Sequence, residues 1–271
     1  MMTFTLQQIP TVPLEAEVLS PDRIAGLGFD EVCALPVFHG KRQLRLDDFF
    51  RIDGDPSDEL ELQGDLSRVK WIGRGMTRGK IRIVGNVGMH LGSYMTGGTI
   101  DVSGNTADWA GGEMTGGSIH IHGNAGGQIG AAYRGSMSGM SGGRILIDGA
   151  AGIELGMRMK KGLIAVKGPV RDFAGLQMKG GSIFLLGGAE IRTGAWMSRG
   201  TIVSLTPLRL LPTFAYACAY RPSFLRVYAR HLQALGFNIP HENQDGNYRR
   251  HIGDSSVPGK GEILMWEGRV E

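Results

Sequence analysis

Two histidines are the residues whose types and spacing come closest to a metal site. His120 and His122 are two positions apart, so a β-strand would place both rings on one face, and Asp101 lies one repeat earlier as a further oxygen ligand. Asp101 is the most that the neighbouring repeats add, and the alternative is a pair of exposed histidines without an ion. The alternative is favoured, so no metal site is expected.

A row of cations is the second group of interest. Its members lie near methionines that recur in the later part of the chain: Arg158, Lys160, Lys161, Lys179 and Arg199. Like charges on neighbouring turns of chain repel one another unless an anion or an acidic partner compensates them. The row is therefore either a site for a carrier or partner, or a solvated edge that prevents aggregation.

Catalytic residues are not expected in this chain. No serine or cysteine has an identifiable base, and Cys33 and Cys218 are isolated, which excludes clustered thiolates and a disulfide framework. Glycine is abundant, but the sequence contains no Gly-Lys-Ser or Gly-Lys-Thr and no dinucleotide fingerprint. We expect no cofactor to be bound by this chain alone.

An internal repeat of 19 residues positions the two histidines and the row of cations. Seven units begin at Gly64, Gly85, Gly104, Gly123, Gly149, Gly168 and Gly187, in steps of 21, 19, 19, 26, 19 and 19 residues. Each unit contains one methionine of the series Met76, Met95, Met114, Met140, Met159, Met178 and Met197. Each ends with one isoleucine of the series Ile81, Ile100, Ile119, Ile145, Ile164, Ile183 and Ile202. Constant offsets indicate turns that stack in register and argue against a disordered chain.

The segments between the glycines predict short strands. Apolar and polar residues alternate in Ile100-Asp101-Val102-Ser103, which places one face inward. Glycine suits the corners because it adopts positive φ without steric cost. We predict an all-β fold, a single-stranded right-handed parallel β-helix (a β-solenoid) of about seven 19-residue coils, with a mixed N-terminal cap and a C-terminal helix plus tail.

The repeat also predicts the structural residues of these coils. Buried methionines and corner glycines are represented by Met95, Met114, Met178, Gly85, Gly104 and Gly123. The asparagines that follow three of the glycines are expected to form an amide ladder: Asn86, Asn105 and Asn124.

The chain divides into three expected segments. Residues 1–59 form the N-terminal cap, 60–205 the glycine-rich repeats and 206–271 the C-terminal helix and tail. A helix start is predicted at Ser20-Pro21 and a second helix over Pro222 to Leu235. The first segment is expected to cover the open end of the stack.

Two irregularities interrupt the repeat. The fourth unit has seven extra residues between Gly130 and Met140, which form either a binding loop that offers Tyr133 and Arg134 or a harmless bulge. An outward column becomes apolar in the later units, at Leu146, Ala165, Phe184 and Val203. Either the C-terminal helix or a partner subunit is expected to cover it.

Composition limits the class and compartment of the protein. A formal net charge of +3 over 271 residues is too small to argue for nucleic-acid binding. No apolar stretch approaches the length of a membrane span, and the first residues lack the pattern of a secretory signal. We expect a cytoplasmic protein without nucleic-acid or membrane partners.

Four motifs can be compared with known families: the repeat itself, the insertion Gly130-Ala-Ala-Tyr-Arg-Gly135, the entry Gly64-Asp-Leu-Ser-Arg-Val-Lys70 and the tail with Tyr248-Arg-Arg and Gly259-Lys-Gly-Glu-Ile263. Together they resemble the C subunit of formylmethanofuran dehydrogenase. The repeat alone is shared with the β-helix of the glutamate synthase large subunit, whereas the insertion and tail are specific. The likeness covers nearly the whole chain.

The resemblance implies a non-catalytic scaffold subunit of a one-carbon complex. In the bacterial version a formyl group passes from tetrahydromethanopterin to a methanofuran-type polyglutamate carrier and is hydrolysed to formate by formyltransferase and amidohydrolase-like hydrolase subunits. The archaeal dehydrogenase and a glutamate-synthase-like structural domain are the alternatives. Arginine outnumbers lysine 21 to 8, which favours a GC-rich bacterial genome. On this basis the residues expected to contact carrier or partner are those of the loop and the row, Tyr133, Arg134, Arg158, Lys160, Lys161, Lys179 and Arg199.

Overall fold

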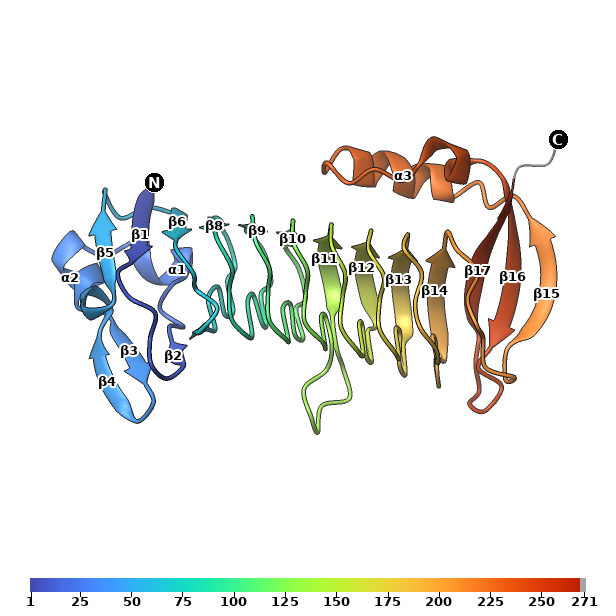
Figure 1. Cartoon of the computed structure of the whole chain (residues 1–271), viewed down its shortest axis with the longest axis horizontal. Helices are drawn as coiled ribbons and strands as arrows, with labels where there is room; N and C mark the ends of the chain where they lie inside the picture. The colour runs from blue at the N-terminus through green and yellow to red at the C-terminus, as the bar shows by residue number, and fades with distance from the viewer. Residues whose placement is uncertain (269–271) are drawn as a thin grey trace.

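Strands that follow one another in the sequence lie side by side in one large, mainly parallel sheet (Figure 1). The computed structural model describes residues 1–268, and in that range the sheet has 13 strands. Those of the repeat are β6 (Glu59–Gln63), β8 (Lys80–Val84), β9 (Thr99–Val102), β10 (Ser118–Ile121), β11 (Ser141–Ile147), β12 (Lys161–Val166), β13 (Lys179–Leu185) and β14 (Arg199–Ser204). The fold is mostly β with few helices.

The pairing register equals the sequence repeat. Ile100 of β9 pairs with Ile119 of β10, which pairs with Ile145 of β11. A second parallel line of bridges joins the turns on another side, through Leu66, Val87, Thr106, Ala125, Ala151, Val170 and Ala189. The isoleucines and methionines of the repeat are fully buried, as predicted. Each inward side chain therefore rests on its equivalent in the neighbouring turn.

Close approach between successive turns is what requires glycine. At Gly85, where φ is 137°, a Cβ atom would lie 2.1 Å from the carbonyl oxygen of Gly64. Gly104 and Gly123 lie at equivalent places without a positive φ, and a Cβ there would still come within 2.5 and 2.6 Å of the oxygens of Gly85 and Gly104. The expectation of positive φ was wrong for these two glycines, because stacking and not the turn excludes a side chain.

The predicted asparagine ladder is confirmed. The Oδ1 atom of Asn86 accepts hydrogen bonds from the backbone N–H and from Nδ2 of Asn105, at 2.9 and 3.0 Å. The Oδ1 atom of Asn105 accepts the backbone N–H of Asn124 at 2.7 Å. The ladder links each asparagine side chain to the backbone of the next turn, so it fixes the register of the turns as well as the orientation of the side-chain amides.

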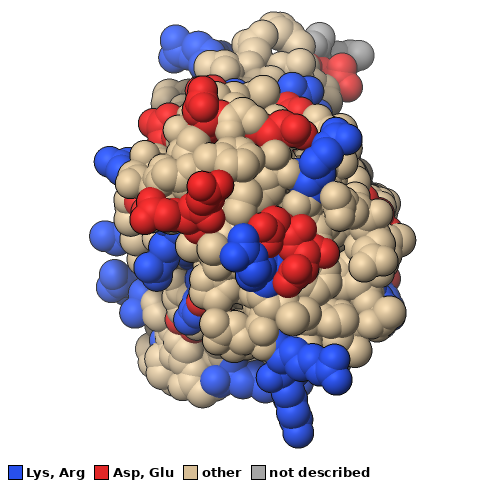
Figure 2. All heavy atoms as spheres, turned by 90° about the vertical axis from the view of Figure 1, so that its left-hand side faces the viewer, with Lys and Arg blue, Asp and Glu red and all other residues tan. Residues whose placement is uncertain are grey.

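The N-terminal segment continues the sheet and adds a smaller one. Strand β1 (Met2–Leu6) pairs in parallel with β6 and antiparallel with β5 (Phe50–Asp53). The smaller sheet contains β2 (Leu14–Glu15), β3 (Pro36–His39), β4 (Arg42–Arg45) and β7 (Val69–Lys70). The helical elements are α1 (Pro21–Ile24), α2 (Phe29–Cys33) and the 3-10 turn η1 (Leu46–Asp48). Helix α1 begins at the predicted Pro21. Seen from this end, carboxylates gather over the centre and many cations lie toward the rim (Figure 2).

The C-terminal segment adds three strands that were not predicted. Strand β17 (Gly261–Gly268) pairs in parallel with β14, and β16 (Asn247–Gly253) and β15 (Ala215–Tyr220) follow antiparallel. The expected glycine-rich tail is thus part of the sheet. Its signal was hidden because Ile263 and Leu264 are buried on opposite faces, which removes the alternation. Residues 269–271 of the expected 206–271 segment lie outside the described part.

Helix α3 (Leu225–Gln233) covers the apolar outward column, which confirms the first of the two alternatives (Figure 1). Phe184 is 1% exposed and its ring centre lies 5.1 Å from that of Tyr228, whose hydroxyl lies 3.0 Å from Oγ of Ser182. The 3-10 turn η2 (His241–Gln244) follows the helix. In residues 1–268 no helix is long and apolar enough to span a membrane.

The buried methionine column predicts the effect of a charge inside the stack. Met114 is fully buried, so Met114→Asp should lower the free energy of unfolding by about 3–5 kcal/mol, because an unpaired carboxylate would lie among apolar side chains. Met137 is 63% exposed, so Met137→Asp should change the free energy of unfolding by less than about 0.5 kcal/mol. Urea unfolding compares the two variants. Equal stability for both would show that the methionine column does not support the fold.

Candidate functional site

The insertion of the fourth unit forms a loop that projects from the row of turns (Figure 1). It lies between Gly130 and Met140, and the pairing of β10 with β11 continues past it. Ala132 at its base is buried, whereas Arg134 and Met137 toward its tip are exposed. The prediction that a loop leaves the repeat here is confirmed.

Two columns of side chains line the corners beside this loop. In residues 1–268, twelve residues other than glycine adopt left-handed φ between 53° and 69°. The first column contains Trp71, His90, Trp109, Gln128, Glu154, Phe173 and Arg192. The second contains Tyr94, Glu113, Arg158, Gln177 and Trp196. Left-handed residues of this kind carry strain and gather at functional sites.

The corner columns were not predicted, because the recurring glycines dominate the sequence pattern around them. Every residue of the first column lies two positions before a glycine, as Trp109 does before Gly111, and every residue of the second directly precedes a repeat methionine. This recurrence is readable in the sequence. The recurrence does not reveal that some of these side chains, among them Trp109, Tyr94 and Glu113, contact Tyr133 of the loop.

Tyr133 of the loop folds back onto the columns and completes an aromatic cluster. Its ring stacks on Trp109, with centres 4.6 Å apart and planes inclined by 13°. It also contacts Tyr94 at 5.4 Å, and Trp71 stacks on His90 at 4.0 Å. Such ring pairs add roughly 0.5–1.5 kcal/mol each beyond the area they bury. The loop is therefore fixed to the preceding turns by its own aromatic residue.

Polar contacts fix the same tyrosine. Its hydroxyl lies 2.9 Å from Nδ1 of His90 and 2.7 Å from Oγ of Ser93, and its backbone N–H donates to Oε1 of Glu113 at 2.9 Å. Burial raises the pKa of Tyr133, and burial together with the nearby charge of Lys70 lowers the pKa of His90 to about 4. Ser93 is fully buried, so a substrate does not reach its hydroxyl. The chain of three groups is structural.

A cleft of about 870 Å³ lies between the loop and the corners. We call it the loop cleft, and it is lined by Met89, His90, Asp108, Trp109, Gln128, Tyr133, Arg134, Gly135, Glu154, Met157 and Arg158. Its walls combine aromatic rings with both carboxylates and guanidinium groups. The cleft can hold a ligand or a partner segment with an aromatic or extended polar part.

Two cations of the predicted row hold the loop in place. Nε of Arg158 donates to Oε1 of Gln177 at 2.6 Å, and its guanidinium also donates to the carbonyl oxygen of Ser136. Nζ of Lys179 donates to the carbonyl oxygen of Met137 at 2.9 Å. These contacts give Arg158 and Lys179 a structural task on the inserted loop.

The other three cations are open to a ligand. Lys160, Lys161 and Arg199 are exposed, and no carboxylate of residues 1–268 lies within ion-pair distance of them. They lie near Lys179 on neighbouring turns, since Arg199 pairs with Lys179 between β13 and β14. The loop and these cations share one edge of the molecule, which we call the loop edge. It can attract an anion.

The partly buried imidazole of His90 predicts a pH dependence of the protein's stability. Because the folded pKa of His90 is about 4 and the ordinary value is 6.5, the unfolded chain binds a proton between these values that the folded chain does not. Stability should therefore fall as pH falls from 6.5 to 4, by about 1 kcal/mol after allowance for partial exposure of the ring. His90→Gln should lose less stability than the wild type over this range in urea unfolding, and exposed His241→Gln should behave like the wild type. Equal slopes for all three would contradict this account of His90.

Comparison with known proteins gives partial and full-length relatives. No protein-family model matches the chain. The C subunit of tungsten-containing formylmethanofuran dehydrogenase 2 from Methanothermobacter thermautotrophicus is 42% identical over 94 residues, which are 33% of this chain and 35% of that protein. The C subunit of the molybdenum-containing enzyme from the same organism is 47% identical over 83 residues, 30% of this chain and 21% of that protein. The matched region thus spans only about a third or less of these archaeal relatives.

Bacterial relatives match from end to end. The C subunit of the formyltransferase/hydrolase complex of Methylorubrum extorquens is 48% identical over 247 residues, 91% of this chain and 92% of that protein. A chain in the crystal structure of the formyltransferase/hydrolase complex of the same organism, with methylofuran, superposes with a TM-score of 0.89 and 34% identity over 98% of this chain and 99% of that chain. The resemblance to this family is confirmed: the chain belongs to the family of the C subunit of the formyltransferase/hydrolase complex.

Proposed function

We propose that this chain is a non-catalytic scaffold subunit of a formyltransferase/hydrolase complex. In that complex a formyl group passes from tetrahydromethanopterin to a methanofuran-type carrier and is hydrolysed to formate. The single observation that carries the proposal is the end-to-end match to a chain of the solved complex, at a TM-score of 0.89 over 98% of the residues. Its partners would be the formyltransferase and amidohydrolase-like hydrolase subunits.

The coverage of the matches distinguishes the bacterial complex from the two alternatives, the archaeal dehydrogenase and a glutamate-synthase-like domain. The archaeal dehydrogenase subunits align over about a third of the chain, whereas the bacterial subunit aligns over 91%. A glutamate-synthase-like domain should lack the inserted loop, but here Tyr133 is built into the corners by stacking and hydrogen bonds. The bacterial complex therefore remains our proposal, and a cytoplasmic location goes with it.

The finer architecture belongs to the same proposal. Two lines of parallel pairing with one 19-residue register support a single-stranded parallel β-helix, and the near-universal hand of parallel crossovers favours a right-handed one. Residues 1–59 and the described part of the C-terminal segment, 206–268, would then cap the two ends of the repeats. A rod of this kind has a long surface and a rigid register, which suits a subunit that positions others.

The loop edge is our candidate for contact with the carrier. The solved relative was crystallised in complex with methylofuran, and a carrier with a glutamate chain is a polyanion. Lys160, Lys161 and Arg199 present positive charge that no carboxylate of the described chain neutralises. Arg134 on the loop adds a further exposed positive charge. Exposed contacts of this type are individually weak and are screened by salt. The edge would guide the carrier and leave the chemistry to other subunits.

Charge reversal tests this assignment. Lys179 is left unchanged because it holds the loop. The test variant combines Lys160→Glu, Lys161→Glu and Arg199→Glu. The control combines Lys41→Glu, Arg42→Glu and Arg209→Glu, at residues that are also exposed, and gives the same change of charge. The test variant should reduce carrier content or complex yield severalfold at low salt and much less at high salt. The control should match the wild type. Unchanged carrier content and yield in the test variant at both salt concentrations would leave the row as a solvated edge.

A further inference from the structure

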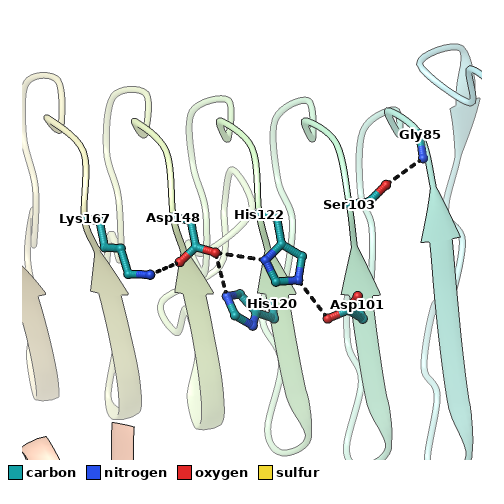
Figure 3. Close-up of polar contacts among 7 residues, drawn as sticks. All are labelled: Gly85, Asp101, Ser103, His120, His122, Asp148 and Lys167. Atoms are coloured by element: carbon teal, nitrogen blue, oxygen red, sulfur yellow. Dashed lines mark hydrogen bonds and ion pairs between the residues drawn. The ribbon is translucent and has the colours of Figure 1, made fainter. Parts of the chain in front are cut away.

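A second polar cluster lies along neighbouring strands of the sheet (Figure 3). Asp148 and Lys167 follow the last residues of their strands, whereas Lys161 and Arg199 of the loop edge begin theirs. The cluster joins four neighbouring turns: Asp101 comes from β9, His120 and His122 from β10 and its end, Asp148 follows β11 and Lys167 follows β12. The apolar column that helix α3 covers begins in the same region, at Leu146. The cluster is therefore the polar border of a covered face.

Asp148 holds both imidazole rings. Its Oδ2 atom lies 2.9 Å from Nδ1 of His122 and 3.1 Å from Nε2 of His120. Its other oxygen, Oδ1, lies 2.6 Å from Nζ of Lys167, which neutralises the carboxylate and fixes its position. One nitrogen of each ring is thus engaged by a single anchored carboxylate.

The remaining ring nitrogen of His122 points at a second carboxylate. Nε2 of His122 lies 3.2 Å from Oδ2 of Asp101 on the adjacent strand. One ligand atom each from Asp101, His120 and His122 can be chosen so that all three lie within 4.8 Å of one another. Metal-binding histidines usually donate their other N–H to a carboxylate that sets the orientation of the ring, and Asp148 is placed to do this.

We propose that Asp101, His120 and His122 bind a divalent transition-metal ion such as Zn²⁺, with Asp148 as the residue that orients the two imidazoles. Two nitrogens and one carboxylate oxygen are the ligands that Zn²⁺ takes readily, and three protein ligands leave a position for water or for a group of a partner subunit. The three ligand atoms lie within 4.8 Å of one another, so modest side-chain rotations would bring them to bonding distance of one ion.

The sequence alone favoured a pair of exposed histidines because it offered only Asp101 as a third ligand. Asp148 lies 26 residues after His122, because the fourth unit contains the inserted loop. It lies beside the two histidines only because the loop leaves the pairing of β10 with β11 undisturbed. The structure adds the orienting carboxylate and the lysine that holds it. The proposal does not rest on the proposed function of the chain.

Titration of the full chain with Zn²⁺ in a non-chelating buffer tests the site. Calorimetry should show one equivalent bound in the wild type, and Co²⁺ in its place should give the visible absorption of a low-coordinate site. His122→Gln and Asp101→Asn keep hydrogen-bonding groups at exposed or half-buried positions and should retain the melting curve of the metal-free chain, while each weakens Zn²⁺ binding at least tenfold. His231→Ala, at an exposed position of α3, is the control and should bind like the wild type.

Two outcomes would overturn the metal site itself. The first is a wild-type chain that binds no Zn²⁺ at the titration concentrations. The second is an affinity that neither His122→Gln nor Asp101→Asn changes, which would place the ion elsewhere. Asp148→Asn should weaken binding less than these two variants do, since it orients the rings and is not a ligand. A larger loss for Asp148→Asn would also contradict the assigned roles.

Discussion

The close contact of each turn with the next, in a register of 19 residues, is the constraint on which the rest of the structure depends. A Cβ atom at Gly104 would come within 2.5 Å of the oxygen of Gly85, so glycine is what permits the turns to approach. The same approach brings isoleucine onto isoleucine and methionine into the core. It also brings the side chains of different turns together on the outside.

Both candidate sites are consequences of this stacking. At the corners it aligns strained residues into columns, on which Tyr133 is held by ring stacking and by the hydrogen bonds of its hydroxyl and its backbone N–H. On the sheet face it brings Asp148 beside His120 and His122, although 26 residues separate it from His122. The inserted loop lies outside the register of the turns. It therefore forms the loop cleft without displacing Asp148 from the two histidines.

The repeat predicted the core, the asparagine ladder, the inserted loop and a covered apolar column, because each follows from periodic spacing or from one exposed apolar strip. Of the two covers that the sequence left open, the structure shows helix α3. Contacts between unlike turns were not predictable. The packing of Tyr133 on the corner columns, the bonds of Arg158 and Lys179 to the loop backbone and the strands β15 to β17 depend on how non-equivalent segments meet in space. Arg158 and Lys179 were expected to bind carrier or partner, and their role there stays a prediction beside the structural one.

We propose that the chain serves as a scaffold and does no chemistry alone. The most direct measurement is mass spectrometry of the proteins that co-purify with the native chain, combined with a formyltransferase and hydrolase assay of the same preparation and of the isolated chain. We expect formyltransferase and hydrolase subunits in the preparation, activity in the complex and none in the isolated chain. Turnover by the isolated chain, or a native chain that purifies without these partners, would contradict the claim.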